Sequence, residues 1–422
     1  MSLNFFYENA ASPNLILSWL TQFPYHTFLQ SFNNQNDKYS QFEWIAAWAT
    51  ESCLKIETLA ALDICLKNNP EKYWFGGFSY SLIESIEPSV KLKKKASIPF
   101  PEVFLFAAEG VVLKPKGGQP ITHIFSDKKP EWSSLFNENQ HSSLILANPV
   151  LEYSDYQQLV KQVLDEIYAG NTYELNLTCE FLATGNFAAK QFYRLLSNVS
   201  QAPFTYWFAW NHKLLIGSSP ERFLAKRDQL LIAQPIKGTI AQKNTLQENI
   251  NAIRQFQSND RFQAENVMIV DLMRNDFYRI CLPHSVEVPQ LFAVQTLNNL
   301  FHLYSTITGI CRPETTLGEI IRAVFPTGSM TGAPKIKTIQ LIDNYEVTGR
   351  SAYSGSLGYI LPGGDFDFAV VIRTLIYEAL QQQISFHVGG AIIAESDPIE
   401  EWNELLLKAN NIQQCLKNLT NR

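Results

Sequence analysis

The sequence of 422 residues lacks several features by which chemistry is often recognised. It has six cysteines, and none stands in a Cys-x-x-Cys pair, so neither a zinc site nor a disulfide framework is indicated. Reduced thiols in a cytosolic compartment fit this pattern best. The cysteines are Cys53, Cys65, Cys179, Cys281, Cys311 and Cys415.

Long apolar runs and an excess of basic residues are also missing. No run approaches the roughly 20 apolar residues that span a bilayer, and the segment Met1–Phe6 lacks the basic start of a secretory signal. The net charge of −6 gives no footprint for nucleic acid or anionic lipid. The one basic cluster, Lys91–Lys95, is interpreted as a solvated loop. We therefore expect a soluble, cytoplasmic protein that binds neither nucleic acid nor membrane.

What is present is an ordinary globular balance, with 46% hydrophobic and 18% charged residues. A chain of this length forms one large α/β unit or two to three smaller domains. Prolines, glycines and polar residues gather between residues 114 and 148, which is typical of a linker or a loosely attached edge. We place the main boundary near residue 148, between regions 1–147 and 148–418.

The clearest elements follow this boundary. Ser154 is a candidate cap for a helix whose apolar residues recur every three to four positions until Gly170 ends it. The next segment, 173–181, alternates apolar and polar residues as a half-buried strand does. Its polar face therefore begins with Glu174 and Asn176.

Lys237 stands in an apolar segment, where a lysine needs a reason to be. The pattern predicts a hairpin with Arg222–Lys226 as one strand, Asp228 at the turn and Gln229–Lys237 as the return. Burial would lower the pKa of Lys237 and leave a neutral, nucleophilic amine. The alternative is a lysine at a strand end that reaches the solvent.

Glu221 precedes the first strand of this hairpin, so the hairpin brings it toward Lys237. A carboxylic acid beside a lysine could protonate a leaving hydroxyl while the amine attacks, provided that both pKa values are displaced. The alternative is a salt bridge at the surface.

Three glutamates are candidate ligands for a hard cation. Glu265 is expected to open a helix, and Glu401 and Glu404 stand three residues apart, on one face of the last long helix. Mg²⁺ is typically held by one or two protein carboxylates together with the substrate. The alternative for Glu404 is an ion pair with Lys408 one turn later, and sequence distance alone does not join Glu265 to Glu404.

Further candidates are contacts for an anion. The loop 327–335 leads into a helix, and free amides there would favour a carboxylate or phosphate, with tight packing of the loop as the alternative. Its spacing is not that of a nucleotide P-loop. Arg373 interrupts an apolar strand over 368–376 and should meet a carboxylate bidentately, either that of a ligand or that of a buried Asp or Glu. The remaining candidates are Tyr353, the turn Gly389-Gly390-Ala391, and His302, for which a satisfied interior residue is the alternative.

Together these segments resemble the chorismate-utilising enzymes, which include the first components of anthranilate synthase and aminodeoxychorismate synthase and the isochorismate and salicylate synthases. The resemblance runs from about residue 150 to 418. It implies an α/β (α+β) fold with large antiparallel-rich sheets packed as a sandwich and helices outside, as in anthranilate synthase component I. It also makes 148–418 the chorismate-binding catalytic domain. The segments that carry it are Ser218–Glu221, Pro235–Thr239, Glu265–Asp276, Thr331–Lys335 and Ser396–Lys408.

Two positions point to a sub-family. Anthranilate synthases have Pro-Ile-Ala-Gly-Thr where this chain has Lys237 in place of the alanine, and lysine is typical of aminodeoxychorismate synthases that use a covalent enzyme intermediate. Glu174 stands where isochorismate and salicylate synthases carry a lysine that activates water. The resemblance therefore implies that chorismate and ammonia are converted to 4-amino-4-deoxychorismate, for the synthesis of p-aminobenzoate and folate.

The resemblance also implies roles for individual residues. Lys237 adds to ring carbon C2, Glu221 protonates the departing 4-hydroxyl, and ammonia then attacks C4. Glu265 and Glu404, supported by Glu401, would bind Mg²⁺. Ammonia would come from a separate glutamine amidotransferase subunit, because no segment resembles one. The implied substrate-binding residues are Gly238, Thr239, His302, Tyr353, Arg373, Gly389, Gly390 and Ala391.

Three positions depart from the family pattern. Ile240 replaces an arginine after Gly-Thr, Phe262 stands where many relatives have a carboxylate, and Ala391 stands where relatives often have glycine. Two alternatives stay open: an anthranilate synthase component I and, because of Phe262 and Ile240, a non-catalytic, carboxylate-binding regulator on the same fold. A remnant of the relatives' tryptophan pocket is expected around Ser31 and Pro203-Phe204.

Overall fold

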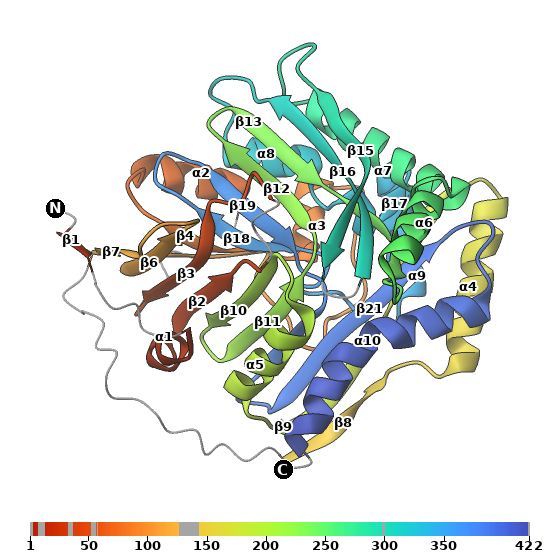
Figure 1. Ribbon diagram of the computed structural model, residues 1–422, viewed down its shortest axis with the longest axis horizontal. Coiled ribbons are helices and arrows are strands. Elements are labelled where there is room, and N and C mark those ends of the chain that lie inside the picture. The colour runs from red at the N-terminus through yellow and green to blue at the C-terminus, as the bar shows by residue number, and fades with distance from the viewer. Residues whose placement is uncertain are drawn as a thin grey trace.

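The computed structural model describes residues 3–6, 13–32, 37–51, 56, 58–125, 143–297 and 300–420. Within them, two antiparallel sheets pack face to face and helices cover their outer faces (Figure 1). The expected sandwich of antiparallel-rich sheets with helices outside is confirmed. Cys53 lies outside the described residues, and the other five cysteines are buried.

The larger sheet has twelve strands in the described part of the chain. Their order is β1 (Leu3–Phe6), β7 (Ile121–Ile124), β6 (Gly110–Pro115), β3 (Phe42–Ala49), β2 (Tyr25–Gln30), β10 (Phe204–Trp210), β11 (Lys213–Ser219), β20 (Thr374–Glu378), β21 (Gln383–Ile392), β9 (Glu174–Asn186) and β17 (Gly332–Ala333), with β8 (Ser143–Pro149) also paired to β9.

The smaller sheet has nine strands among the described residues. Their order is β14 (Ile236–Ala241), β16 (Leu300–Ile310), β13 (Leu230–Gln234), β12 (Arg222–Arg227), β19 (Phe366–Val370), β18 (Ser356–Ile360), β4 (Trp74–Phe78) and β5 (Val103–Ala107), with β15 (Glu287–Leu297) also paired to β16.

Three apolar layers hold the sandwich together. Between the sheets, Ile45 and Phe208 of the larger sheet belong to one cluster with Phe75 and Phe104 of the smaller. Other clusters pack helices onto the two outer faces. The larger sheet is covered by α1 (Pro13–Leu20), α4 (Tyr153–Tyr168), α5 (Ala189–Ser200) and α10 (Pro398–Thr420), and the smaller by α2 (Leu59–Asn68), α7 (Asp260–Tyr278) and α8 (Leu317–Val324). The remaining helical segments are η2 (Tyr80–Leu82), α3 (Ile83–Ile86), α6 (Leu246–Gln257), η3 (Gly328–Met330) and α9 (Lys335–Tyr345).

β9 shows how alternation in the sequence becomes two faces of a strand. Leu175 and Leu177 belong to the cluster under the helices. Glu174 and Asn176 point to the opposite side and are buried there. A buried polar face needs partners, and these come from the smaller sheet and from the loop before α9.

Several predicted boundaries shift. Ser154 lies inside the first turn of α4, because Glu152 takes the N-cap position, while Gly170 follows the helix with φ +77° as predicted. Glu265 does not open its helix, since α7 begins at Asp260. The hairpin of β12 and β13 is confirmed, with Asp228 at φ +53° in its turn.

The apolar strand predicted around Arg373 is wrong in an informative way. The segment forms two strands, β19 in the smaller sheet and β20 in the larger, and Arg373 lies where the chain crosses between them. Its backbone has φ +50°, a left-handed conformation that is uncommon for a residue with a side chain. The crossing places this arginine between the two sheets.

Strands from both sides of residue 148 pair within the same sheets, as β4 does with β18 and β2 with β10. The division into two domains stays a prediction, and residues 126–142 of the predicted linker lie outside the described residues. In the part of the chain that the structure describes, no helix combines the length and apolar character needed to cross a membrane.

Candidate active site

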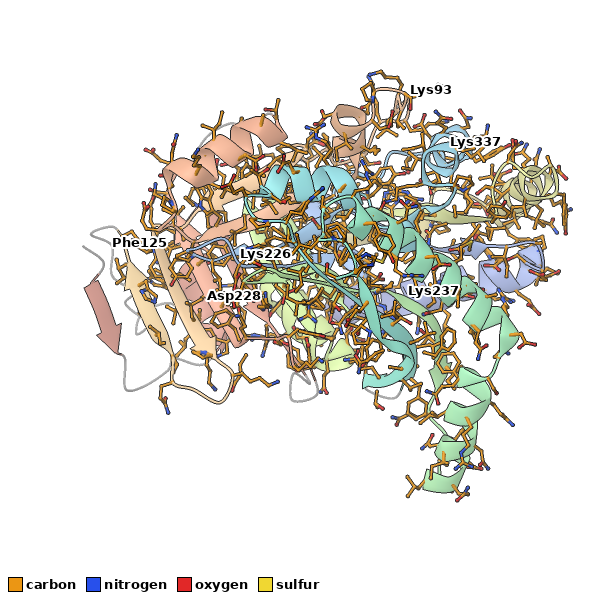
Figure 2. All side chains as sticks on the ribbon, turned by 90° about the horizontal axis from the view of Figure 1, so that it is seen from above. Lys93, Phe125, Lys226, Asp228, Lys237 and Lys337 are labelled. Carbon is orange, nitrogen blue, oxygen red and sulfur yellow. The ribbon has the colours of Figure 1, made fainter. Side chains whose placement is uncertain are left out.

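Lys237 of β14 lies between the sheets and faces Glu174 of β9. Its Nζ donates a hydrogen bond to Glu174 Oε1, and the two groups form an ion pair. Lys237 is 6% exposed and Glu174 is fully buried. In Figure 2, Lys237 lies within the body of the molecule, whereas Lys93 lies at its edge. Lys237 is therefore not a lysine that reaches the solvent, and the pair joins the two sheets.

The local sequence explains the placement of Lys237. Pro235 has no N–H to give to a sheet, and the predicted return strand is split there into β13 and β14, which both pair with β16. Gly238 follows with φ +84°, and a Cβ at this position would stand 2.9 Å from Phe262 and 3.0 Å from Phe256. Only glycine fits this backbone without strain, and its close packing fixes the neighbouring Lys237.

The predicted lowering of the Lys237 pKa is wrong. Burial lowers the pKa of Lys237, but the negative charge of Glu174 raises it, and the charges of Glu265 and Glu221 raise it further. The pKa of Lys237 therefore stands above its ordinary value. The amine is held as an ammonium ion until a proton acceptor takes its proton.

Glu221 lies at the start of β12 and is 4% exposed, so it is not part of a surface salt bridge. Burial raises its pKa to about 7, although Ser329 Oγ donates a hydrogen bond of 2.7 Å to its Oε1. At neutral pH a large fraction of this group carries a proton that it can donate. Ser329 was not singled out in the sequence, although it lies in the loop 327–335.

The loop 327–335 is tightly packed, which was the alternative interpretation of its sequence. Its residues Gly332 and Ala333 form β17, which pairs with the start of β9. Lys335 Nζ donates a hydrogen bond of 2.6 Å to Asp276 Oδ2 and another to Val324 O, so it is paired within the protein. The loop thus supports β9 and presents Ser329 to the site.

Arg373 is a cation that meets no carboxylate in the part of the chain that the structure describes. Within the described residues, no hydrogen bond or ion pair to its guanidinium is formed, and only the charge of Glu221 acts on it. Burial lowers its pKa, which shows that its charge is poorly compensated. The structural ion pair considered for this residue is absent from the described residues, and an anion from outside the chain would complete it.

His302 of β16 is fully buried, and its Nδ1 lies 2.8 Å from Thr239 Oγ1. Burial, with help from Arg373, lowers its pKa to about 3, so the ring is neutral. Its Nε2 is buried and has no hydrogen-bond partner among the described residues. Tyr353 is buried and stacks on His387 with ring centroids 5.1 Å apart. Contact of these residues with a ligand stays a prediction.

The candidate metal ligands gather around one arginine. Arg261 of α7 donates to Glu265 Oε1 at 3.2 Å and lies 3.7 Å from Glu401 Oε1. Its guanidinium thus joins two carboxylates from helices that are far apart in the sequence. The spacing Arg261–Glu265, one helical turn, is a signal that sequence reasoning missed.

Glu404 pairs with Lys408 at 2.6 Å, as the alternative reading proposed. The predicted turn at Gly389-Gly390-Ala391 is wrong, because these residues lie inside strand β21 and pair with β9. A Cβ on Gly390 would stand 3.3 Å from Glu401 Oε2 and 3.7 Å from Glu404 Oε1, so this part of the strand lies beside both carboxylates. Lys408 also donates to Gly389 O at 2.8 Å. Gly389 and Gly390 therefore lie beside the C-terminal helix that carries Glu401 and Glu404.

No group of three or more His, Cys, Asp or Glu side chains with metal-binding geometry occurs in the described residues. Mg²⁺ needs fewer, because it takes oxygen ligands and keeps several waters. Glu265, Glu401 and Glu404 offer only carboxylate oxygens, and a guanidinium already holds two of them. These residues fit a hard divalent cation that displaces Arg261.

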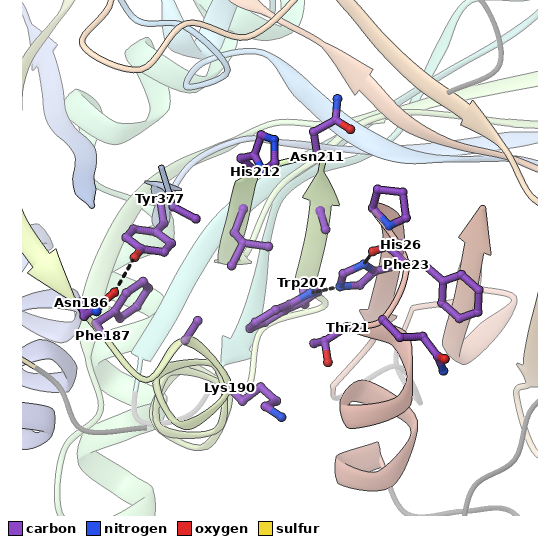
Figure 3. Close-up of a pocket in the computed structure, with 16 residues that line it drawn as sticks. Thr21, Phe23, His26, Asn186, Phe187, Lys190, Trp207, Asn211, His212 and Tyr377 are labelled. Atoms are coloured by element: carbon purple, nitrogen blue, oxygen red, sulfur yellow. Dashed lines mark hydrogen bonds between the residues drawn. The ribbon is translucent and has the colours of Figure 1, made fainter. Parts of the chain in front are cut away.

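A cavity of about 840 Å³ lies elsewhere, on the helix-covered face of the larger sheet (Figure 3). It is lined near one end of β9, at Asn186, whereas Glu174 begins that strand. The two residues stand at opposite ends of this strand of 13 residues, roughly 40 Å apart. His26 in this cavity is bonded through both ring nitrogens, to Phe23 O and Trp207 Nε1. The cavity is not part of the site around Lys237.

A second cavity, of about 50 Å³, is lined by Ser31, Pro203 and Phe204 among others, where the sequence predicts a remnant pocket. Binding of a ligand there stays a prediction.

The comparisons with known proteins agree on the family. A family described as chorismate binding enzyme matches residues 15–414. The anthranilate synthase component I-like protein of Synechocystis is 31% identical over 84% of this chain and 75% of its own length. Aminodeoxychorismate synthase component 1 of Escherichia coli is 36% identical over 62% of this chain and 57% of its own length. The chloroplastic aminodeoxychorismate synthase of Arabidopsis thaliana is 40% identical over 60% of this chain and 28% of its own length. The chain thus spans between 28% and 75% of the length of these relatives, and less than two thirds of the two that are named aminodeoxychorismate synthases.

Two solved structures show the same fold. Anthranilate synthase component I from Streptococcus pneumoniae superposes with a TM-score of 0.73 at 23% identity, over 92% of this chain and 90% of that one. The menaquinone-specific isochorismate synthase of Escherichia coli superposes with a TM-score of 0.80 at 17% identity, over 99% of this chain and 94% of that one.

Proposed function

Because the chain belongs to the family of chorismate binding enzymes, we propose that it is an aminodeoxychorismate synthase component I. In this proposal, a cytoplasmic enzyme converts chorismate and ammonia to 4-amino-4-deoxychorismate, on the route to p-aminobenzoate and folate. The observation that carries the proposal is Lys237, a buried amine that bonds Glu174 and feels the charge of Glu221, a buried carboxyl group whose pKa is raised to about 7. Relatives named aminodeoxychorismate synthase support it.

The site provides groups for both ends of a dianionic substrate. Arg373, with no carboxylate partner among the described residues, would bind the enolpyruvyl carboxylate, with Tyr353 beside it. The ring carboxylate would lie at Gly389-Gly390-Ala391, next to the glutamates. Thr239 and the buried ring of His302 would line the pocket.

In the proposed reaction, the Lys237 amine attacks C2 of the ring, the double bonds shift, and the bond from C4 to its hydroxyl breaks. Glu221 donates a proton to that oxygen, which leaves as water. Ammonia then attacks C4 and the bond from Lys237 to C2 breaks.

Glu265 and Glu404, with Glu401 in support, would hold Mg²⁺. When bound, the ion would neutralise the ring carboxylate and the charge that develops beside it. We also propose a separate glutamine amidotransferase subunit as the source of ammonia, in line with the name component 1 of the Escherichia coli relative.

Anthranilate synthase component I is the second candidate, favoured by the Synechocystis relative. The test supplies the purified protein with chorismate, Mg²⁺ and an ammonium salt and identifies the product by mass spectrometry. Aminodeoxychorismate supports the proposal, and anthranilate as the sole product refutes it. Any turnover under these conditions dismisses a non-catalytic regulator.

The role of Lys237 is tested by variants. Lys237→Ala should abolish formation of aminodeoxychorismate, while Lys226→Ala, a lysine of the same hairpin that faces Asp365 at 4.0 Å, should leave it unchanged. Intact-protein mass after chorismate is added without ammonia should reveal an adduct that maps to Lys237. Unaltered product and rate in Lys237→Ala would favour anthranilate synthase.

A further inference from the structure

Glu174 is a buried carboxylate whose two oxygens have different surroundings. Its Oε1 accepts from Lys237 Nζ, while its Oε2 is buried and has no hydrogen-bond partner among the described residues. A buried carboxylate with an unbonded oxygen costs free energy. Such a group persists where its chemistry is used.

The surroundings of Lys237 leave Glu174 as its nearest proton acceptor. Glu221 is needed as a proton donor, and its oxygen bonds Ser329 rather than the lysine. Glu265 bonds Arg261, and Glu404 bonds Lys408. Among the described residues, Glu174 is the carboxylate that directly bonds Nζ.

The burial of Glu174 strengthens it as a proton acceptor. Burial raises the pKa of Glu174 despite the attraction of Lys237, and Glu265 raises it further. A carboxylate with a raised pKa binds a proton more tightly than an ordinary one, whereas the raised pKa of Lys237 opposes release of its proton. Glu174 is therefore a stronger proton acceptor than a carboxylate in water.

We infer that Glu174 takes the proton of Lys237 before the amine attacks and returns it when the amine leaves, and so prepares the nucleophile within the closed site. This inference rests on the proposed function and deepens it. The position of Glu174 at the first residue of β9, held by pairing with β17, aims the carboxylate at Nζ across the gap between the sheets.

The proton balance closes over one turnover. A proton passes from the Lys237 ammonium to Glu174, and the neutral amine forms the bond to C2 while Glu221 gives its proton to the hydroxyl that leaves C4 as water. When ammonia has bonded to C4 and the bond from C2 to Nζ breaks, Lys237 departs as an amine and recovers its proton from Glu174. The new ammonium group on C4 gives one proton to Glu221, which restores the acid.

The test compares Glu174→Gln and Glu174→Asp with the wild-type protein, at fixed concentrations of chorismate, Mg²⁺ and free ammonia across a range of pH. The glutamine still accepts a hydrogen bond from Lys237 but takes no proton. We expect kcat near neutral pH to fall by about a hundredfold, the lower end of what proton transfer contributes. We also expect a new ascending limb, about tenfold per pH unit, because Lys237 must then lose its proton to solvent.

Glu174→Asp keeps the carboxylate and should recover at least about tenfold of the lost rate without the ascending limb. A merely structural Glu174 would lower the rate without altering the shape of the pH profile. Circular dichroism and thermal unfolding check that the variants fold. If only Glu174→Asp folds, an ascending limb in its profile overturns the inference.

The outcomes separate the two proposals. A wild-type protein that forms no aminodeoxychorismate overturns the proposed function and this inference with it. A wild-type protein that forms it, together with a Glu174→Gln variant of similar rate and unaltered pH profile, overturns the inference alone.

Discussion

The hydrogen bond from Ser329 to Glu221 allows a prediction with a definite sign. A donor to a carboxylate stabilises its ionised form, so this bond lowers the pKa of Glu221, which burial raises to about 7. Removing the donor in Ser329→Ala should raise that pKa further. A hydrogen bond to a charged group is worth about 1.5–3 kcal/mol, which corresponds to roughly one to two pKa units at about 1.4 kcal/mol per unit.

Glu221 acts as a proton donor in the proposed reaction, so kcat should fall as pH rises through its pKa. In Ser329→Ala the descending limb should move to higher pH by about one to two units. The assay measures kcat from about pH 5 to 9.5, a range set by ordinary side-chain pKa values, with the concentration of free ammonia held constant. Ser285→Ala is the control, because its hydroxyl bonds backbone groups at Leu282 and Ile310, away from the site. A midpoint that stays unchanged or moves to lower pH would refute the reasoning.

Three further predictions concern neighbouring groups. Gly238→Ala should lower kcat at least about tenfold and destabilise the fold by about 1–3 kcal/mol, because φ is +84° and Phe262 stands 2.9 Å from the new Cβ. Turnover and urea unfolding measure the two effects. Wild-type values in both measurements would contradict this prediction. Arg261→Ala should reduce the Mg²⁺ concentration for half-maximal rate about two- to fivefold, since an exposed ion pair is worth up to about 1 kcal/mol. Arg274→Ala on the same helix is the control. A higher Mg²⁺ concentration for half-maximal rate in Arg261→Ala would contradict this prediction. Glu221→Gln should abolish turnover and stabilise the protein at pH 8 relative to wild type by at most about 3 kcal/mol. Because the pKa of Glu221 is raised, the folded state keeps a proton that the unfolded state loses above about pH 4.5. The wild-type protein therefore loses the stability contributed by this proton as pH rises through about 7, whereas the glutamine variant does not. Equal unfolding midpoints of the two proteins at pH 8 would contradict this prediction.

Local patterns in the sequence predicted the elements that carry the site. The alternation that begins at Glu174 gave a strand with a polar face, and the turn at Asp228 gave the hairpin that leads to Lys237. These features depend on neighbours a few residues away, which a sequence displays directly. The error at Arg373 has the same origin, because an apolar run does not reveal that the chain crosses from one sheet to another.

The chemistry between elements was less accessible. Lys237 and Glu174 are 63 residues apart and belong to different sheets, so no local pattern indicates that they meet. Without that partner, burial alone predicts a lowered pKa for the lysine, the opposite of what its surroundings produce. The direction of a pKa shift in a buried pair depends on which charge faces it, and this is a property of the fold.

The departures from the family pattern acquire a common explanation in the structure. Taken singly, Ile240 and Phe262 suggest a weakened loop and a missing carboxylate. In the fold they pack in one apolar cluster with Phe256, Phe301 and Leu303, and Phe256 and Phe262 meet edge to face at 5.0 Å. The same two rings lie against Gly238, so the cluster fixes the backbone that carries the nucleophile. A charged residue placed at either position would lie partly buried against apolar side chains, which is why we regard the two departures as one coupled change.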